Sequence, residues 1–282
     1  MYHAKSAGRN TCRFFSPEMD EEAHERFAIE RDLRLALSRD EFELHFQPQL
    51  DSVRQHLIGA EALLRWRHPK RGLLGPNQFL TIAEESGLIL PIGEWVLQAA
   101  CMQARRWADA GLPIRVAVNL SAQQFRRGNI ANAVCAALEK AGLPAERLEL
   151  ELTESMLLHP TVEVLARLGE LNELGVRLSL DDFGTGYSSL NYLKSYPIDQ
   201  LKIDRSFVEG IESKQEDRAI IRAIQSLAEA LGQQTIAEGV ETADQSAAVR
   251  AIGCHHQQGY LFGRPMPAAE FDAWVRTQVP RG

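Results

Sequence analysis

The sequence predicts an α/β protein of the (β/α)₈ barrel class, and two observations favour this fold. Eight short β-rich runs alternate with amphipathic stretches of helical period after residue 43, a pattern typical of parallel βαβ units. Eight such units in about 240 residues fit a barrel, because single-domain barrels commonly run to about 250 residues. A doubly wound open sheet is the alternative, but the G-x-G-x-x-G fingerprint that would support nucleotide binding there is missing.

The strand candidates are short apolar runs bounded by turn residues. In order they are Leu44–Leu50, Leu57–Arg65, Ile114–Leu120, Leu148–Thr153, Val176–Leu180, Gln200–Ile203, Gln234–Ala237 and a weaker run at His255–Gln258. Many of the helix candidates are followed by Gly-Leu-Pro or a lone Gly after the last apolar turn. They are Gly93–Ala110, Asn129–Ala141, Val162–Leu174, Tyr187–Lys194 and Asp217–Leu231.

The beginning of the chain differs from the rest. Residues 1–27 are polar and have no periodic pattern, which predicts a tail or linker ahead of a barrel domain at 28–282. Ile29, Leu33 and Leu37 recur at helical spacing, so we expect a helix over Ala28–Leu37.

Composition limits the classes of function. The chain has 282 residues, 45% of them hydrophobic and 24% charged, with a formal net charge of -7, which is typical of a globular protein and argues against a basic face for duplex DNA or RNA. We expect no direct membrane contact and a cytoplasmic location, because the chain has no apolar run of about 18 residues and no signal peptide. Cys12, Cys101, Cys135 and Cys254 lie far apart and are predicted to be reduced, mostly core-filling thiols.

Polar residues follow the predicted strands at their carboxyl ends, where barrel proteins carry their active sites. The second run carries Glu61 and Arg65 inside an apolar segment, and the third ends in Asn119. The remaining runs deliver Glu149, Glu151 and Glu154, then Asp181 and Asp182, then Lys202 and Asp204, and finally Glu238 and Glu241. Five strands therefore bring acids or amides to one rim.

Such a rim has an electrostatic problem, because two carboxylates about 4 Å apart repel by roughly 4 kcal/mol at an effective dielectric near 20. Oxygen ligands without Cys or His indicate hard divalent ions such as Mg²⁺ or Mn²⁺. Neighbours in a strand face opposite sides, so Asp181 and Asp182 reach one site only if the strand breaks, which Gly184 and Gly186 permit. Two metals about 3.5–4 Å apart sharing Asp181 would suit phosphoryl displacement.

Each residue also has an ordinary structural explanation when it is taken alone. Glu61 could be salt-bridged or solvent-facing, Asn119 could cap a helix, and Lys202 could form a barrel-interior salt bridge to Asp181. Glu241 could sit early in a helix, where acids suit the dipole, and Glu149 and Glu154 could only hold loops. The coincidence of these residues at successive strand ends favours the joint interpretation.

The residues then resemble a known family. Glu61-Ala62-Leu63, within GAEALLRWRHP, looks like the signature of the EAL domains, bacterial phosphodiesterases of cyclic di-GMP. The resemblance covers roughly Ala28 to Val279. The other segments that match in family order are FQPQL (Phe46–Leu50), VNLSAQQF (Val118–Phe125), ELTES (Glu151–Ser155), DDFGTGYSSL (Asp181–Leu190), LKID (Leu201–Asp204), AEGVET (Ala237–Thr242) and QGYLFGRP (Gln258–Pro265).

The resemblance implies a TIM-type barrel with a reversed first strand and a set of site residues. Metal ligands would be Glu61, Asn119, Glu151, Asp181, Asp182 and Glu238. Among the catalytic residues Glu61, Asp181, Lys202 and Glu238, Lys202 would orient the attacking water and Glu238 would act as the base. Gln47, Arg65, Asp182, Glu241 and Gln258 would lie close to the dinucleotide, Arg65 being suited to a phosphate oxygen. Glu154 would hold the DDFGTG loop, through which the family forms a homodimer.

The leading segment MYHAKSAGRNTCRFF is similar to the end of a GGDEF domain, the cyclase partner that often precedes EAL. The interpretation is therefore a fragment of a GGDEF-EAL protein, in which residues 1–27 are the remnant and linker and Ser16 to Arg39 contain the connecting helix. Sensory domains and a membrane anchor could lie upstream. Departures from the family pattern are small: Phe46 stands where Tyr is common, and Arg264 where Lys is common.

The reaction implied is hydrolysis of one phosphodiester bond of cyclic di-GMP to linear pGpG with two Mg²⁺ or Mn²⁺ ions, while Ca²⁺ is expected to permit binding more than turnover. One alternative is a non-catalytic cyclic di-GMP receptor with the EAL fold. Another is an unrelated two-metal barrel hydrolase that acts on a different diester.

Overall fold

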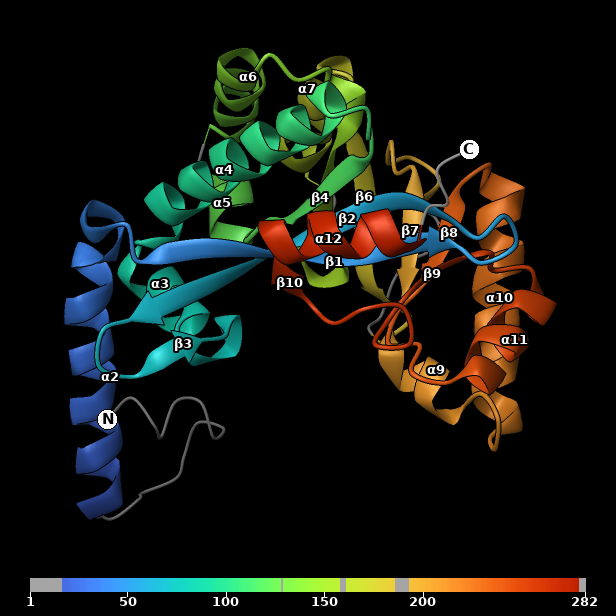
Figure 1. Cartoon of the computed structure of the whole chain (residues 1–282), viewed down its shortest axis with the longest axis horizontal. Helices are drawn as coiled ribbons and strands as arrows, with labels where there is room; N and C mark the ends of the chain where they lie inside the picture. Colours follow the sequence, from blue (N-terminus) through green and yellow to red (C-terminus); the bar gives the residue numbers. More distant parts are fainter. Residues whose placement is uncertain (1–16, 128, 158–160, 186–192, 279–282) are drawn as a thin grey trace.

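A closed barrel of eight strands organises the computed structural model, which describes residues 17–127, 129–157, 161–185 and 193–278 (Figure 1). The strands are β1 (Phe42–Asp51), β2 (His56–His68), β4 (Arg115–Asn119), β5 (Leu148–Thr153), β6 (Arg177–Phe183), β7 (Gln200–Ile203), β8 (Gln234–Ala237) and β9 (His256–Gln258). They follow the order β1-β9-β8-β7-β6-β5-β4-β2, and the pairing of β1 with β2 closes the barrel. Each of the eight predicted strands is confirmed.

The first strand runs against the others. β1 pairs antiparallel with both β2 and β9, whereas the pairs from β2–β4 round to β8–β9 are parallel. The reversed first strand is therefore confirmed. Short strands β3 (Gly72–Leu74) and β10 (Met266–Pro267) extend the sheet at its edges.

Helices cover the outside of the barrel, and the long ones were predictable. The predicted helices α4 (Ile89–Asp109), α6 (Ile130–Ala141), α7 (Val162–Glu173) and α10 (Gln215–Leu231) are confirmed within a few residues. Local capping explains one of them: the Asn129 side chain accepts a hydrogen bond from Asn132 N, and Gly142 ends the helix in the left-handed conformation. The candidate Tyr187–Lys194 lies largely outside the described residues.

Several helices were not predicted. They are α3 (Leu80–Ser86), α5 (Ala122–Arg127), α9 (Arg205–Gly210), α11 (Ala243–Ile252) and α12 (Ala268–Gln278), with 3₁₀ turns at Leu37–Arg39, Pro76–Gln78, Ala145–Arg147 and Glu154–Met156. Most are too short to display a helical period. α11 did carry a local signal, because Thr242 and Gln245 form a capping box and Gly253 follows the last turn.

The helix start predicted from periodicity was wrong, whereas the connecting helix within Ser16–Arg39 is confirmed. α2 spans Pro17–Ala36, so it begins eleven residues before the predicted Ala28. The physical reason is that the apolar residues of α2 that the structure shows buried, Ile29, Leu33 and Ala36, all lie in its second half. The first half therefore lacks the apolar stripe on which the prediction depended.

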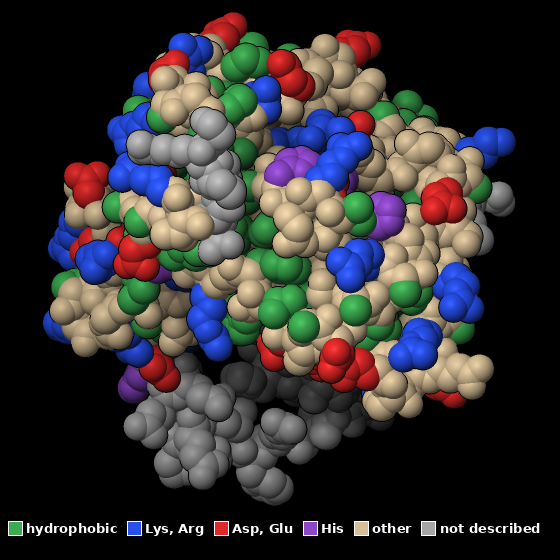
Figure 2. Space-filling model, turned by 45° about the vertical axis from the view of Figure 1, so that its right-hand side comes forward, with side chains coloured by type: hydrophobic (Ala, Val, Ile, Leu, Met, Phe, Trp, Pro, Cys, Tyr) green, Lys and Arg blue, Asp and Glu red, His purple; other side chains and the backbone are tan. Residues whose placement is uncertain are grey.

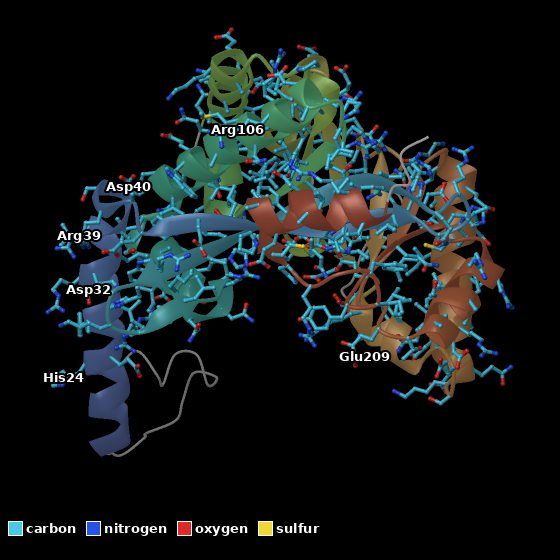
Figure 3. All side chains as sticks on the ribbon, in the orientation of Figure 1. His24, Asp32, Arg39, Asp40, Arg106 and Glu209 are labelled. Atoms are coloured by element: carbon cyan, nitrogen blue, oxygen red, sulfur yellow. The ribbon has the colours of Figure 1, made fainter. Side chains whose placement is uncertain are left out.

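α2 docks on a lobe formed by α3, β3 and the far end of β2 (Figures 1 and 3). Asp32 Oδ2 lies 3.4 Å from Nε2 of the buried His68, and Glu25 Oε1 lies 2.6 Å from Arg71 Nη1. The ring of Trp66 packs against His68 with centroids 4.8 Å apart. The Asp32–His68 contact thus joins α2 to β2, the strand that carries Glu61, and the Glu25–Arg71 ion pair joins α2 to the turn after β2.

The thiols behave as core residues in the described part of the chain. Cys101 and Cys254 are buried, Cys135 is half-buried, and all three are free. Burial raises the pKa of Cys101 and of Cys254 to about 12, so both thiols stay protonated. Cys12 lies outside the described residues. Among those residues, none of the helices combines the length and the apolar character needed to cross a bilayer.

Candidate active site

The predicted polar residues converge at one end of the barrel interior. Parallel strands meet that end with their carboxyl termini, so the inward positions of β2, β4, β5, β6 and β7 lie side by side. The reversed β1 contributes from its middle, where Gln47 pairs with Glu61 in register. The residues so assembled are Gln47, Glu61, Asn119, Glu151, Asp181, Lys202, Glu238 and Gln258.

Lys202 lies among the carboxylates. Its side chain is only 1% exposed, and Nζ lies 2.6 Å from Glu151 Oε2, 2.7 Å from Glu238 Oε1 and 3.1 Å from Asp181 Oδ1. Burial alone would lower the pKa of Lys202, but the surrounding carboxylates outweigh it and hold that pKa well above its usual value. Lys202 is therefore a fixed positive charge, and the predicted bridge to Asp181 is one of three.

Glu61 remains ionised in spite of its burial. Asn119 Nδ2 donates to Glu61 Oε1 at 2.6 Å, and Gln258 Nε2 donates to Oε2 at 2.5 Å. Burial raises the pKa of Glu61, but the charge of Lys202 and these two hydrogen bonds lower it below its usual value. Asn119 thus bonds to Glu61, and its predicted alternative role as a helix cap is not what the geometry shows.

Two other carboxyl groups have raised pKa values. Burial and the charge of Glu61 raise the pKa of Glu151 well above its usual value. Burial likewise raises the pKa of Glu238 to about 8, although Lys202 opposes the shift. Glu238 is consequently mostly protonated at neutral pH, as expected where several acids share one cation.

The donor set suits a hard divalent cation. It consists of carboxylate and amide oxygens, and Oε1 of the buried Glu151 accepts no hydrogen bond within the described part of the chain. No three of the described His, Cys, Asp or Glu side chains already stand in metal-binding geometry; three of the acids contact Lys202 instead. The residues fit such an ion by their chemistry, and the number of ions stays a prediction.

The strand is irregular at Asp181 and Asp182, as predicted, but Asp182 and not a glycine makes the turn. The β6–β7 register shifts between Leu180 and Phe183, and Asp182 itself has a left-handed backbone with φ 55°. Its N–H donates to Asp181 Oδ1 at 3.0 Å. Gly184 also has a positive φ, but it lies beyond the break, and Gly186 is outside the described residues. Aspartate tolerates this conformation better than most residues, so Asp182 itself can form the turn without a glycine.

A chain of glutamines supports Glu61, and one of its members was missed. Gln258 Nε2 bonds to Gln47 Oε1 at 3.0 Å as well as to Glu61, while Gln258 Oε1 accepts from Gln49 Nε2 at 2.9 Å. Gln49 therefore sets the orientation of the Gln258 amide. The signal was present in FQPQL, where the period of two places Gln47 and Gln49 on one face of the strand.

The remaining predicted residues lie around this cluster. The N–H of Gly184 donates to Glu154 Oε2 at 3.2 Å, which ties the loop after β6 to β5. Arg65 is half-buried at the rim, where burial lowers its pKa and Glu61 partly restores it. Glu241 lies just before α11, and its side chain is exposed; no hydrogen bond joins that side chain to the carboxylates among the described residues.

Glu149 belongs to the opposite end of the barrel. Its carboxylate is buried and lies 2.9 Å from Arg115 Nη1 and 3.8 Å from Arg177 Nε, and Gln200 Nε2 donates to it at 3.3 Å. The idea that Glu149 only holds a loop was wrong, because it neutralises two arginines on neighbouring strands. Glu149 and Glu151 share the inward face as predicted, but only Glu151 reaches the site.

The raised pKa of Glu238 leads to an expected dependence of stability on pH. The pKa of the Glu238 carboxyl group is raised from its ordinary value of 4.5 to about 8 in the folded chain. Its contribution is therefore complete below pH 4.5 and is lost as the pH rises toward 8, because the folded state then holds more protons than the unfolded state. In EDTA, the free energy of unfolding from urea titrations should fall between pH 5 and 8, by at most about 1.4 kcal/mol per pH unit for this group.

Glu238→Gln should make this slope flatter, whereas Glu209→Gln, on the exposed surface of α9 (Figure 3), should leave it unchanged. A slope that is equally steep in Glu238→Gln would show that Glu238 is not the group concerned.

Comparison with known proteins gives concordant results. A family model described as "EAL domain" matches residues 30–265. "Bifunctional diguanylate cyclase/cyclic di-GMP phosphodiesterase MucR" of Pseudomonas aeruginosa is 46% identical over 98% of this chain, and "Cyclic di-GMP phosphodiesterase PdeR" of Escherichia coli is 40% identical over all of it. The chain spans 40% and 42% of the lengths of these two relatives.

Solved structures agree in fold. The structure titled "PaMucR Phosphodiesterase, c-di-GMP complex" has a TM-score of 0.84 at 46% identity and matches 86% of this chain and 99% of its own. The FimX EAL domain of Xanthomonas citri in complex with c-diGMP has a TM-score of 0.80 at 29% identity, over 88% of this chain and 97% of its own.

Proposed function

Because the chain belongs to the EAL domain family, we propose that it hydrolyses one phosphodiester bond of cyclic di-GMP and releases linear pGpG. The observation that carries this proposal is the cluster of Glu61, Asn119, Glu151, Asp181 and Glu238 around the buried Lys202. The phosphodiesterase names of its relatives and the dinucleotide named in the PaMucR structure support it.

The carboxylate cluster would hold one or two divalent ions, Mg²⁺ or Mn²⁺. The proposed ligands are Glu61, Asn119, Glu151, Asp181, Asp182 and Glu238. Such ions lower the pKa of bound water and neutralise charge on a phosphate. The acidic site thereby becomes compatible with an anionic substrate.

The other residues act on water and substrate. Lys202 is a fixed cation suited to orient the attacking water and to stabilise charge that develops on the phosphate. Glu238 is proposed to take a proton from that water, because its raised pKa makes its ionised form a stronger base than an ordinary carboxylate. The residues proposed to surround this cluster and to contact the dinucleotide are Gln47, Arg65, Asp182, Glu241 and Gln258. The Glu154–Gly184 bond is proposed to stabilise the DDFGTG loop and a homodimer formed through it.

One assay tests the function. The chain is incubated with cyclic di-GMP and Mn²⁺ over a range of protein concentrations, and pGpG is separated by chromatography. We expect pGpG, with a specific activity that rises with concentration if the dimer is required. Binding by calorimetry without pGpG would support the receptor alternative, and turnover of other diesters but not of cyclic di-GMP would support an unrelated hydrolase.

Removal of metal is expected to abolish turnover. EDTA should eliminate pGpG formation, and excess Mg²⁺ or Mn²⁺ should restore it, because the site is acidic without cations. Ca²⁺ should restore binding more than turnover, since it tolerates looser coordination and activates water less. Unfolding monitored by circular dichroism in EDTA is the control, because a folded chain is needed to attribute the loss to the site. Full activity in EDTA would contradict the metal assignment.

A further inference from the structure

Tyr260 presents an aromatic ring on the loop that leaves the candidate site. It follows Gln258 by two residues, and its side chain and that of Leu261 are 48% and 40% exposed. The guanidinium carbon of Arg264 lies 4.1 Å from the centre of the Tyr260 ring. One face of the ring is therefore covered by a cation, while much of the side chain remains open.

The loop is held rigidly. Val240 N donates to Gln258 O at 3.1 Å, Leu261 N donates to Val240 O at 3.0 Å, and Gln47 Nε2 donates to Gly263 O at 3.1 Å. A Cβ atom at Gly259 would lie 2.1 Å from Val240 O, so only glycine permits this approach of the two backbones. The backbone that carries Tyr260 is therefore fixed, and little conformational entropy is lost when a ligand contacts its side chain.

Both ends of the loop that carries Tyr260 are tied to residues of the candidate site. Gln258, at the start of this loop, bonds to Glu61, and Gly263, near its end, accepts a hydrogen bond from Gln47. Carboxylates surround Lys202 inside the barrel, whereas the loop anchored to Glu61 and Gln47 carries an aromatic ring with a guanidinium on it. A ligand with flat, aromatic bases matches this ring in chemistry.

We propose that the ring of Tyr260 stacks on a purine base of the substrate, with Arg264 on its opposite face. This inference rests on the proposed function and names a binding residue for it. Stacking of a base on an aromatic side chain is favourable for any π-face, and a cation on the other side of the ring adds to it. The contact would hold the base without touching the reacting phosphate.

Substitution of Tyr260 separates stacking from other roles. Tyr260→Leu should raise the KM for cyclic di-GMP about tenfold and leave kcat within about twofold, because a contact away from the reacting atoms stabilises substrate and transition state alike. Tyr260→Phe should retain the KM of the unmodified chain, and Arg264→Met should raise it less than Tyr260→Leu does. Leu261→Ala, at the adjacent exposed position, is the matched control and should change neither constant.

Further measurements distinguish a lost stacking contact from a disturbed Gln258–Glu61 hydrogen bond and from a failure of the proposed function. If Tyr260→Leu disturbed Gln258 and Glu61, the affinity for Mn²⁺ measured by calorimetry would fall, whereas stacking predicts no change. An unchanged KM in Tyr260→Leu, or equal loss in Tyr260→Phe, would overturn the inference. Absence of turnover in the unmodified chain would instead refute the proposed function, and cyclic di-GMP affinities of the same variants by calorimetry would then decide on Tyr260.

Discussion

Replacement of Lys202 by methionine is expected to abolish turnover and to destabilise the fold. Methionine fills a similar space without the charge, so Glu151, Asp181 and Glu238 lose their shared cation. Breaking a buried ion pair by removing one partner costs roughly 3–5 kcal/mol. Protonation of the acids reduces that cost at low pH, so the loss should grow as the pH rises. Loss of a fixed charge at the reacting phosphate should lower turnover by at least about a hundredfold.

Urea unfolding in EDTA at several pH values measures the first effect, and pGpG formation with saturating Mn²⁺ measures the second. Lys214→Met is the matched control, because the Lys214 side chain is 67% exposed and lies 3.9 Å from Asp217; it should change neither quantity appreciably. A Lys202→Met chain as stable and as active as the unmodified one would refute the central role of this ammonium group.

Asp181→Asn and Glu61→Gln are expected to lower turnover by at least about a hundredfold while the fold is retained. Both changes keep the shape of the side chain and remove one negative charge from the proposed metal ligands. They also leave Lys202 with two carboxylate partners or more. Calorimetric titration with Mn²⁺ should show weaker binding in each variant. A residue that only transferred a proton would leave the Mn²⁺ affinity unchanged.

Glu149→Gln is a useful control, because Glu149 is also buried and faces into the same barrel. It neutralises Arg115 and Arg177 at the opposite end, so its replacement should lower the melting temperature but not the Mn²⁺ affinity. Full activity of Asp181→Asn or Glu61→Gln would remove that residue from the list of metal ligands.

Most of the barrel could be predicted because its strands are short apolar runs separated by long amphipathic helices. Leu44–Leu50 and Gln200–Ile203 are examples in which burial on both faces leaves little ambiguity. The same period predicted that Glu149 and Glu151 share a face. It could not predict that they lie at opposite ends of the interior, because this depends on where each strand meets its neighbours.

Other features depended on contacts that no local pattern encodes. The break at Asp182 results from a register shift between β6 and β7, and the role of Gln49 depends on Gln258, which lies far along the chain. The first turns of α2 have no apolar stripe, so their helical structure was invisible to periodicity. The packing of Arg264 on Tyr260 likewise required the loop geometry.

The reversed first strand has a topological consequence. In an all-parallel barrel, the chain enters at the end opposite the active site. Here β1 begins beside Trp66 and Arg65 and finishes beside His256, so α2 joins the barrel at the catalytic end. Asp32 of α2 contacts His68 at the end of β2, the strand that also carries Arg65 and Glu61. The reversed strand therefore places the N-terminal helix α2 at the same end of the barrel as the candidate active site.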